Sequence, residues 1–304
     1  MAANLARSFL HWHAGSDIIF QLVTDLPDAV PSDLADKIDV ITIQKDELGG
    51  GFSPKLHLDR LVSDGQTFFI DSDCLIFENL NLLFERFQDH DVSVVGGYIQ
   101  EGEWFGQIES VCKRFNVPHI PKFNGGLYYI EKGSKASSVY ATARELESSY
   151  DEIGFVRLRG HPNDEVLMAL AMQLHGQTPI FDDGTIMSDP QACPGGYMID
   201  VIGGRRWLYN PPPPHPLHRA WNPYSRVSPA IVHFLGFYTK HYPYKREATR
   251  LSRKLSNQLT WANEMAIILQ TEYPERMKIV FKNVFRPLYH LLFGVRTPNQ
   301  SERL

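Results

Sequence analysis

Two carboxylates stand at the end of an apolar run in the first third of the chain. The stretch FFIDSDCLIF places Asp71 and Asp73 two residues apart, directly after Phe68–Ile70. In an extended chain, residues i and i+2 share a face, so both carboxylates can bind one ion. Oxygen ligands of this kind suit a hard cation such as Mg²⁺ or Mn²⁺. A solvated strand end or an Asx turn is the alternative for a lone D-x-D pattern.

A glycine-rich stretch, KFNGGLYYI, follows about fifty residues later. Asn124, Gly125 and Gly126 stand just before an apolar run that favours a strand. Glycine lets the backbone approach a ligand closely, and the asparagine amide can both donate and accept hydrogen bonds. An ordinary turn explains the same residues in isolation.

Two further stretches carry polar groups next to apolar segments. In GHPNDEVLMAL, either Asn163 or Asp164 can cap a helix, and Glu165 adds a second carboxylate. IVHFLGFYTKHY offers His233 as a metal ligand, Gly236 for close backbone approach, and Lys240 as a cation for phosphate. A hydrogen-bonded core histidine is the alternative for His233.

The elements that position these residues alternate between helix and strand. Such alternation indicates an α/β sheet flanked by helices, in which ligands bind at the carboxyl ends of the strands. We expect helices at Asn4–His13, Pro54–Val62, Trp104–Phe115, Lys135–Ser148 and Asp164–Leu174, and strands at Ile18–Thr24, Val40–Ile43, Thr67–Ile70, Val92–Val95, Gly126–Ile130, near Ile180 and Ile186, and at Ala230–Phe234. After Tyr242 the pattern is helical, with breaks expected at Pro274 and Pro287.

The bulk composition excludes several classes of protein. A chain of 304 residues, 43% of them hydrophobic, can bury a large core. Three scattered cysteines without a C-x-x-C motif indicate neither a disulfide framework nor a zinc site. The start of the sequence lacks the pattern of a signal peptide, and no apolar run is long enough to span a membrane. We therefore expect a cytoplasmic protein. The net charge of −12 over residues 1–239 fits poorly with a general nucleic-acid binder, and we expect no nucleic-acid partner.

The order of the four stretches resembles the glycogenin-like and bacterial galactosyltransferase-like (family 8-like) retaining glycosyltransferases. These have the GT-A fold, a mixed sheet flanked by helices. The resemblance covers roughly residues 4–245 and rests on a strand-terminal D-x-D, then N-x-G, D-[QE]-x-x-L and H-x-x-G with a downstream lysine. It implies a catalytic domain over residues 1–242, followed by a helical basic region over residues 243–304.

The resemblance also implies roles for individual residues. Asp71, Asp73 and His233 would hold Mn²⁺ or Mg²⁺ against the diphosphate of a nucleotide-sugar. The catalytic residues would be Asp164, which grips the donor sugar, and Glu165, beside the anomeric carbon. The substrate-binding residues would be Lys55, Ser72, Asn124, Gly125, Gly126, Gly236 and Lys240.

Three departures from the family pattern stand out. The first strand of the fold should precede Asn4, and this sequence leaves no residues for it. Lys240 follows His233 by seven positions instead of the usual six. Glu165 replaces a glutamine, which makes the reaction face more acidic and would favour a covalent route.

The expected function is therefore metal-dependent transfer of a hexose from a nucleotide-diphosphate sugar, with a UDP-sugar as first choice, to a hydroxyl acceptor. The resemblance implies retention of anomeric configuration. The alternatives are a nucleotide-sugar or glycan-binding protein without catalysis, and a sugar nucleotidyltransferase that uses the same D-x-D site.

The C-terminal region has its own charge pattern. Residues 240–304 carry 12 Lys and Arg against 5 Asp and Glu, a net charge of +7, whereas residues 1–239 carry −12. Lys278, Lys282 and Arg286 share one helical face beside an apolar stripe that includes Phe281 and Phe285. The stripe either packs on the catalytic domain or lies on an anionic membrane surface. The second alternative implies a peripheral protein on the inner face of a membrane and a lipid-linked acceptor.

Overall fold

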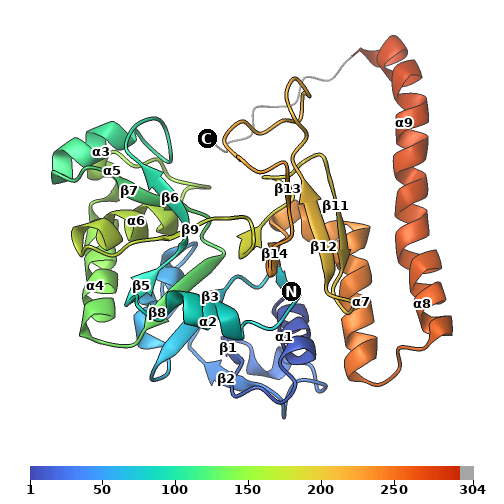
Figure 1. Ribbon diagram of the computed structural model, residues 1–304, viewed down its shortest axis with the longest axis horizontal. Helices are drawn as coiled ribbons and strands as arrows, with labels where there is room; N and C mark the ends of the chain where they lie inside the picture. The colour runs from blue at the N-terminus through green and yellow to red at the C-terminus, as the bar shows by residue number, and fades with distance from the viewer. Residues whose placement is uncertain (295–304) are drawn as a thin grey trace.

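The computed structural model describes residues 1–294 (Figure 1). Its α-helices are α1 (Ala2–Trp12), α2 (Asn81–Phe87), α3 (Ile108–Phe115), α4 (Ser134–Ser148), α5 (Tyr150–Ile153), α6 (Asp164–Leu174), α7 (Tyr242–Leu255), α8 (Trp261–Ile267) and α9 (Tyr273–Phe293). The other helical elements are the 3₁₀ helices η1 (Pro27–Ala29), η2 (Ser53–Arg60) and η3 (Gly236–Lys240), and the π-helical η4 (Ile268–Glu272).

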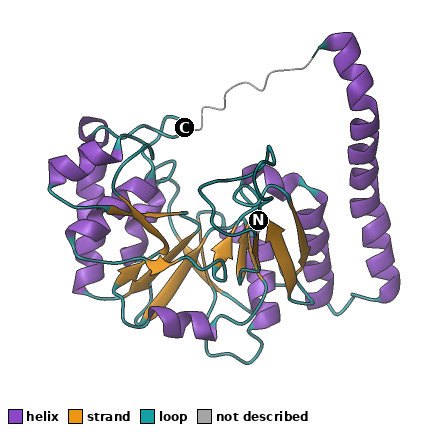
Figure 2. Ribbon diagram, turned by 45° about the horizontal axis from the view of Figure 1, so that its top comes forward, coloured by secondary structure: helices purple, strands orange, loops and turns teal. Residues whose placement is uncertain are grey.

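The strands form small sheets that lie between the helices (Figure 2). They are β1 (Gln21–Thr24), β2 (Asp39–Thr42), β3 (Gln66–Ile70), β4 (Cys74–Ile76), β5 (Val92–Ser93), β6 (Val95–Ile99), β7 (Ile120–Phe123), β8 (Leu127–Glu131), β9 (Ile180–Phe181), β10 (Met187–Ser188), β11 (Gly196–Asp200), β12 (Arg205–Tyr209), β13 (Arg226–Val227) and β14 (Ile231–His233). The mixed α/β architecture agrees with the fold class expected from the sequence.

Strand pairing brings distant segments of the chain together. The sheet orders are β1-β2, β3-β8-β5, β7-β6-β9, β10-β14-β4 and β11-β12-β13. β1 and β2 are parallel, whereas β8 is antiparallel to β3 and β14 is antiparallel to β4. The ends of β3, β8 and β14, which carry the polar stretches of the sequence, are thereby held in fixed register.

The largest apolar core lies around α6 and β8. Eight of the eleven residues of α6 are buried, because its sequence DEVLMALAMQL is apolar on every side after the first turn. α6 packs with α4 and with β7, and the fully buried Tyr128 and Ile130 of β8 belong to the same cluster. The start of α6, which carries the two adjacent carboxylates, is therefore rigidly held.

Some sequence expectations were wrong in detail. The helix expected at Pro54–Val62 is the 3₁₀ helix η2, whose N-terminal Pro54 presets the first turn. The strand expected at Val92–Val95 is divided between β5 and β6, which belong to different sheets. The breaks expected at Pro274 and Pro287 are both absent. The chain passes from the π-helical η4 into α9 with helical dihedral angles, Pro274 lies in the first turn of α9, and α9 continues through Pro287.

Helix α9 stands apart from the rest of the protein in both ribbon views (Figures 1 and 2). None of its residues is buried. Its first turn is attached to α7, because Arg276 lies over the ring of Tyr242 and Glu275 lies 3.7 Å from the ammonium group of Lys245. Within residues 1–294, no helix is both long and apolar enough to cross a bilayer.

Candidate active site

The two aspartates lie in the turn that joins β3 to β4. The backbone N–H of Asp71 donates to the carbonyl of Gly126 at 3.0 Å, which extends the β3–β8 ladder by one pair. The carbonyl of Asp71 then accepts from the N–H of Cys74, and the chain passes into another sheet. Both carboxylates are thus placed at the carboxyl end of β3 by backbone hydrogen bonds on either side.

His233 reaches the same point from the end of β14. Its register partner in the antiparallel pairing is Cys74, the residue that follows Asp73. The buried imidazole Nε2 lies 3.0 Å from a carboxylate oxygen of Asp73 and 3.7 Å from one of Asp71. The structure therefore brings together all three residues that the sequence offered as metal ligands.

Asn124 sets the orientation of the His233 ring. Its Oδ1 accepts the backbone N–H of Gly126 at 2.9 Å and also lies 2.9 Å from Nδ1 of His233. Because this oxygen only accepts, Nδ1 must carry a hydrogen, and in the neutral ring Nε2 is then the basic nitrogen. A ring hydrogen bond of this type is the usual support of a metal-binding histidine.

Gly126 is required for this approach. A Cβ atom at position 126 would lie 2.5 Å from Nδ1 of His233, a distance that no side chain can occupy. The second glycine of the N-x-G pattern therefore makes room for the imidazole, and not only for a ligand.

The donor set fits a hard divalent cation. Asp73, Cys74 and His233 offer atoms within 4.8 Å of one another, and Asp71 adds a fourth group beside His233. Burial raises the pKa of the Cys74 thiol well above its usual value, so it stays neutral and is a poor ligand for such an ion. Two carboxylates and a fixed imidazole remain, a donor set suited to Mn²⁺ or Mg²⁺.

The charges of His233 and its neighbouring carboxylates stabilise one another. Burial alone would lower the pKa of His233, but the nearby carboxylates of Asp73 and Asp71 outweigh it and raise the pKa. Burial alone would raise the pKa of Asp73, but the His233 hydrogen bond and the backbone of Gly236 lower it. A protonated imidazole therefore offsets part of the negative charge of the two carboxylates and would lose its proton to a metal ion.

Lys55, on η2, joins the metal side of the site to the α6 side. Its ammonium group donates to a carboxylate oxygen of Asp71 and to the carbonyl of Gly125, both at 2.8 Å, and lies 3.8 Å from Asp164. Burial would lower the pKa of Lys55, but Asp164 and Asp71 outweigh it and raise the pKa above its usual value. The lysine is therefore a permanent cation at the centre of the site.

The first turn of α6 supplies the remaining carboxylates. Asn163 is the helix cap, since its Oδ1 accepts the N–H groups of Glu165 and Val166. The sequence left open whether Asn163 or Asp164 is the cap. Asp164 is free to turn toward β8, where it accepts the hydroxyl of Tyr128 at 2.6 Å. Glu165 accepts the backbone N–H of Gly125 at 2.8 Å.

Asp164 and Glu165 are both buried, and Lys55 is the cation that opposes the effect of burial on both, so the two carboxylates do not both ionise easily. Burial raises the pKa of Asp164, against the opposing effect of Lys55. Burial and the neighbouring Asp164 raise the pKa of Glu165 to about 7. One proton is therefore held near the start of α6 close to neutral pH.

The other residues predicted to bind substrate are exposed. Ser72 is exposed between the two aspartates, and Gly236 is exposed at the start of η3. Lys240 is exposed at the end of η3, and within the described part of the chain it makes no hydrogen bond or ion pair with the other predicted residues.

Sequence reasoning missed Tyr128. It lies two residues after Gly126 on the same face of β8, so strand alternation could have placed it beside the glycine. No sequence signal reveals that its hydroxyl meets Asp164, because that contact depends on how α6 packs on the sheet.

The chain resembles known proteins in its structure but matches none by its sequence. No protein-family model matches the chain, and no curated protein matches it. Among solved structures, galactosyltransferase LgtC in complex with donor and acceptor sugar analogs covers 85% of this chain and 91% of its own, at 14% identity and a TM-score of 0.52. An active-site mutant of LgtC, with a glutamine changed to glutamate, covers 85% and 92% at 14% identity and a TM-score of 0.50. Mouse xyloside xylosyltransferase 1 in its apo form covers 62% and 80% at 15% identity and a TM-score of 0.42. The likeness to LgtC extends over most of both chains, and this chain has the GT-A glycosyltransferase fold.

Proposed function

We propose that the protein is a metal-dependent glycosyltransferase that moves a hexose from a nucleotide-diphosphate sugar to a hydroxyl group. The observation that carries the proposal is the convergence of Asp71, Asp73 and the Nε2 atom of His233, with Lys55 bridging to Asp164. A metal site and a sugar-binding carboxylate are thus joined by one buried cation. LgtC, which has the same fold, was solved with donor and acceptor sugar analogs.

One group of residues is assigned to the diphosphate of the donor, and another to its sugar. When bound, Mn²⁺ or Mg²⁺ would be held by the two aspartates and His233, and would neutralise charge on the diphosphate. Lys55 adds a fixed positive charge beside Asp71 for the same leaving group. We place the diphosphate between this cation, the exposed backbone of Gly236 and the ammonium group of Lys240.

The sugar half is assigned to Asn124 and the start of α6. Asp164 is held by Tyr128 and by Lys55, so its free oxygen has a fixed direction for accepting sugar hydroxyls. A polar group positioned in this way rejects donors that lack the hydroxyl, because it is then left unpaired. We place the anomeric carbon near Glu165 and expect retention, with the partly protonated Glu165 carboxylate on the reacting face.

Product analysis tests the proposal directly. A panel of nucleotide-sugars, beginning with UDP-hexoses, would be incubated with and without Mn²⁺ and with simple glycosides as acceptors. We expect metal-dependent release of nucleoside diphosphate that Asp73→Asn abolishes. Release of pyrophosphate from a sugar phosphate and a nucleoside triphosphate would indicate a nucleotidyltransferase instead. A thermal shift with a nucleotide-sugar but no product of either kind would indicate a binding protein.

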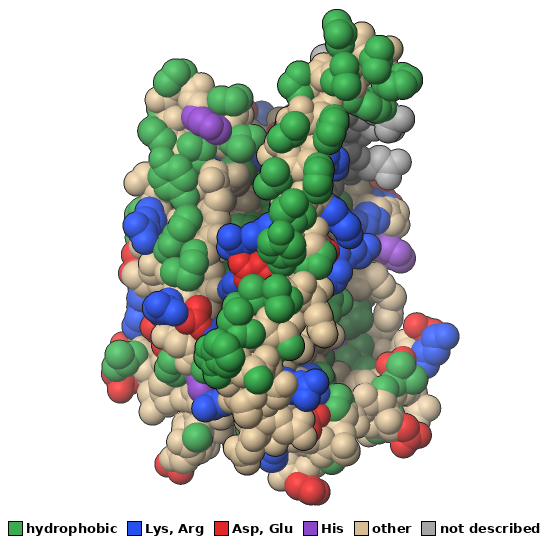
Figure 3. All heavy atoms as spheres, turned by 90° about the vertical axis from the view of Figure 1, so that its right-hand side faces the viewer, with side chains coloured by type: hydrophobic (Ala, Val, Ile, Leu, Met, Phe, Trp, Pro, Cys, Tyr) green, Lys and Arg blue, Asp and Glu red, His purple; other side chains and the backbone are tan. Residues whose placement is uncertain are grey.

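The C-terminal helix favours an acceptor at a membrane surface. The apolar stripe on α9 does not pack on the catalytic domain, because Phe281, Phe285 and Leu291 are 54%, 55% and 81% exposed. Figure 3 shows hydrophobic side chains exposed along this helix. The four-residue spacing of Lys278, Lys282 and Arg286 places them on the helical face beside this stripe. Exposed apolar residues bordered by basic ones are the pattern of a helix that lies in the interface of an anionic bilayer. Each near-surface cation adds about 1 kcal/mol of attraction.

Liposome co-sedimentation tests this contact. We expect binding to vesicles that contain phosphatidylserine, weaker binding in high salt, and none to neutral vesicles. Replacing Lys278, Lys282 and Arg286 together by glutamine should reduce binding by roughly two orders of magnitude if each cation contributes about 1 kcal/mol. Glutamine at the exposed Lys113 of α3 is the control and should change nothing. Equal binding to neutral vesicles, or none to either kind, would contradict the proposal.

A further inference from the structure

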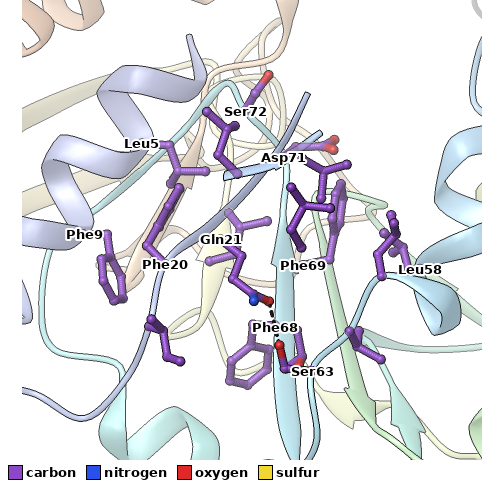
Figure 4. A pocket seen from close by; sticks show the side chains of 18 of the residues that line it. Leu5, Phe9, Phe20, Gln21, Leu58, Ser63, Phe68, Phe69, Asp71 and Ser72 are labelled. Atoms are coloured by element: carbon purple, nitrogen blue, oxygen red, sulfur yellow. Dashed lines mark hydrogen bonds between the residues drawn. The ribbon is translucent and has the colours of Figure 1, made fainter. Parts of the chain in front are cut away.

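Two cavities of the protein differ in their surroundings. The larger, of about 1000 Å³, lies between β1 and β3 and reaches Asp71 and Ser72, so it belongs to the candidate active site (Figure 4). The smaller, of about 520 Å³, lies beside α7 and the start of α9. Its lining shares no residue with the metal cluster or with the carboxylates at the start of α6, so it is a separate candidate binding site.

We call the smaller cavity the arm cleft, because it lies at the base of the arm formed by α8, η4 and α9 (Figure 1). α1, η3 and α7 form one wall of the cleft, and η4 and the start of α9 form the other. Hydrogen-bonded ion pairs join the arm to α7. Arg246 of α7 donates to Glu272 of η4 at 2.7 Å, and Arg250 of α7 donates to Glu264 of α8 at 3.0 Å. The two walls are therefore held together, and a ligand in the cleft would contact both.

Several polar groups that line the arm cleft have hydrogen-bond donors without a protein partner. Within residues 1–294, the side chains of Gln270, Thr271 and Lys278 make no hydrogen bond or ion pair. The buried Tyr244 hydroxyl accepts from the Asn4 amide at 3.3 Å, which leaves its own proton available to donate. Ammonium, hydroxyl and amide donors from both walls therefore line one space.

The charge of the arm cleft favours an anion. Lys245 of α7 and Lys278 of α9 contribute one ammonium group from each wall, and Glu275 contributes a carboxylate, which leaves a net charge of +1. Glu275 lies 3.7 Å from the Lys245 ammonium group, too far for a hydrogen bond, so this pair leaves the donors of Lys245 available. Lysine binds phosphate as a point charge, and the several acceptor oxygens of a phosphate can use ammonium, hydroxyl and amide donors together.

We propose that the arm cleft binds a phosphate group between Lys245 of α7 and Lys278 of α9. Two sources carry the same chemistry, a soluble phosphate monoester and the headgroup of an anionic phospholipid. Lys278 is followed directly by the exposed apolar residues Ile279, Val280 and Phe281, so the cleft lies where the apolar stripe of α9 begins. The proposal does not depend on glycosyl transfer, and its soluble form does not depend on the membrane contact proposed for α9.

Titration calorimetry with glycerol 3-phosphate, in the absence of divalent metal, tests the shared chemistry. We expect saturable binding with a Kd below about 10 mM. Lys245→Gln and Lys278→Gln should each weaken this binding at least about tenfold, because each removes a hydrogen bond to a charged group. Glu275→Gln should strengthen it, because this carboxylate repels the phosphate.

The matched control is Lys282→Gln, which removes the same charge one turn further along α9 and outside the cleft. It should leave the Kd for glycerol 3-phosphate nearly unchanged. The absence of saturable binding, or equal effects of Lys278→Gln and Lys282→Gln, would overturn the proposal.

Co-sedimentation with phosphatidylcholine vesicles that contain phosphatidic acid distinguishes the two sources. A lipid headgroup in the cleft predicts that Lys278→Gln weakens vesicle binding more than Lys282→Gln, although each removes one charge from the same face of α9. Lys245→Gln, which leaves α9 unchanged, should then weaken vesicle binding as well. Equal losses at positions 278 and 282, with the calorimetric result intact, would support the soluble phosphate as the ligand. A protein that binds no vesicles but gives the expected calorimetric result would refute the membrane contact and still support the phosphate site.

Discussion

Replacing Lys55 by methionine should destabilise the protein strongly. The ammonium group lies 2.8 Å from Asp71 and 3.8 Å from Asp164, and its side chain is only 17% exposed. One pair of charges about 4 Å apart near a protein surface attracts by about 4 kcal/mol. The desolvation of the lysine, which the substitution removes, offsets part of this loss. Breaking a buried pair typically costs about 3–5 kcal/mol, and we expect a loss in that range.

The assay is urea denaturation followed by tryptophan fluorescence at two pH values. Without Lys55, the buried carboxylate of Asp164 loses the cation that opposes the effect of its burial, so its folded-state pKa rises further. A folded state with raised carboxyl pKa values binds more protons than the unfolded chain, so its stability increases as the pH falls. The deficit of Lys55→Met should therefore be smaller at pH 5 than at pH 7.5.

The matched control is Lys135→Met. Lys135 pairs with Asp91 at 3.1 Å, but its side chain is 73% exposed. Exposed pairs contribute about 0.2–1 kcal/mol, and a similar loss is expected here. A deficit at position 55 no larger than that of the control, or one that does not depend on pH, would refute the assignment of Lys55 as the buried counter-ion of the site.

Three further predictions concern the same cluster. Burial raises the pKa of Glu165 to about 7 from an ordinary 4.5, so its contribution to the free energy of unfolding is most favourable below pH 4.5 and is lost as the pH rises through 7. Glu165→Gln should remove this loss of stability and stabilise the protein by roughly 2–3 kcal/mol at pH 8. Denaturation measured across this pH range checks the prediction. Gly126→Ala should lower the Mn²⁺ affinity at least about tenfold, measured by titration calorimetry, because the added Cβ displaces His233. The control is Gly125→Ala, whose Cβ would have its nearest neighbours at 3.1 Å and which should lower the affinity less. Equal losses of affinity would contradict the role given to Gly126. Asp73→Asn should abolish the Mn²⁺-induced rise in melting temperature while shifting the metal-free value by less than about 3 °C, and an undiminished metal effect would rule out Asp73 as a ligand.

The sequence was informative where chemistry follows from short-range geometry. The position of Asp71 and Asp73 directly after an apolar run correctly predicts the end of a strand. The i, i+2 argument assumed extended chain, however, and the two residues lie in the turn between β3 and β4. The sequence also narrowed the cap of α6 to an asparagine or an aspartate, and the structure selects Asn163. Their order along the chain pointed to the GT-A fold.

Other features depend on contacts that no short pattern encodes. The hairpin of β11 and β12 was not predicted, since strands dominated by polar and aromatic residues such as RRWLY lack clear apolar alternation. The break expected at Pro287 is absent because α9 is exposed on all sides, so water can satisfy the carbonyl that the proline leaves unpaired. The Lys55 bridge needs η2, β8 and α6 to meet, which is decided by tertiary packing alone.

The Asn124-Gly125 step also bears on the chemical ageing of the protein. An asparagine followed by glycine deamidates readily, because the glycine nitrogen can attack the side-chain amide carbon. Here the N–H of Gly125 donates to the Glu165 carboxylate at 2.8 Å. The side-chain oxygen of Asn124 accepts hydrogen bonds from the N–H of Gly126 and from the His233 ring. The attack requires both sets of contacts to open together, so the folded site shields its own most labile bond. Damage at Asn124 therefore reports how often the centre of the site opens, and stored protein carries that record in its mass spectrum.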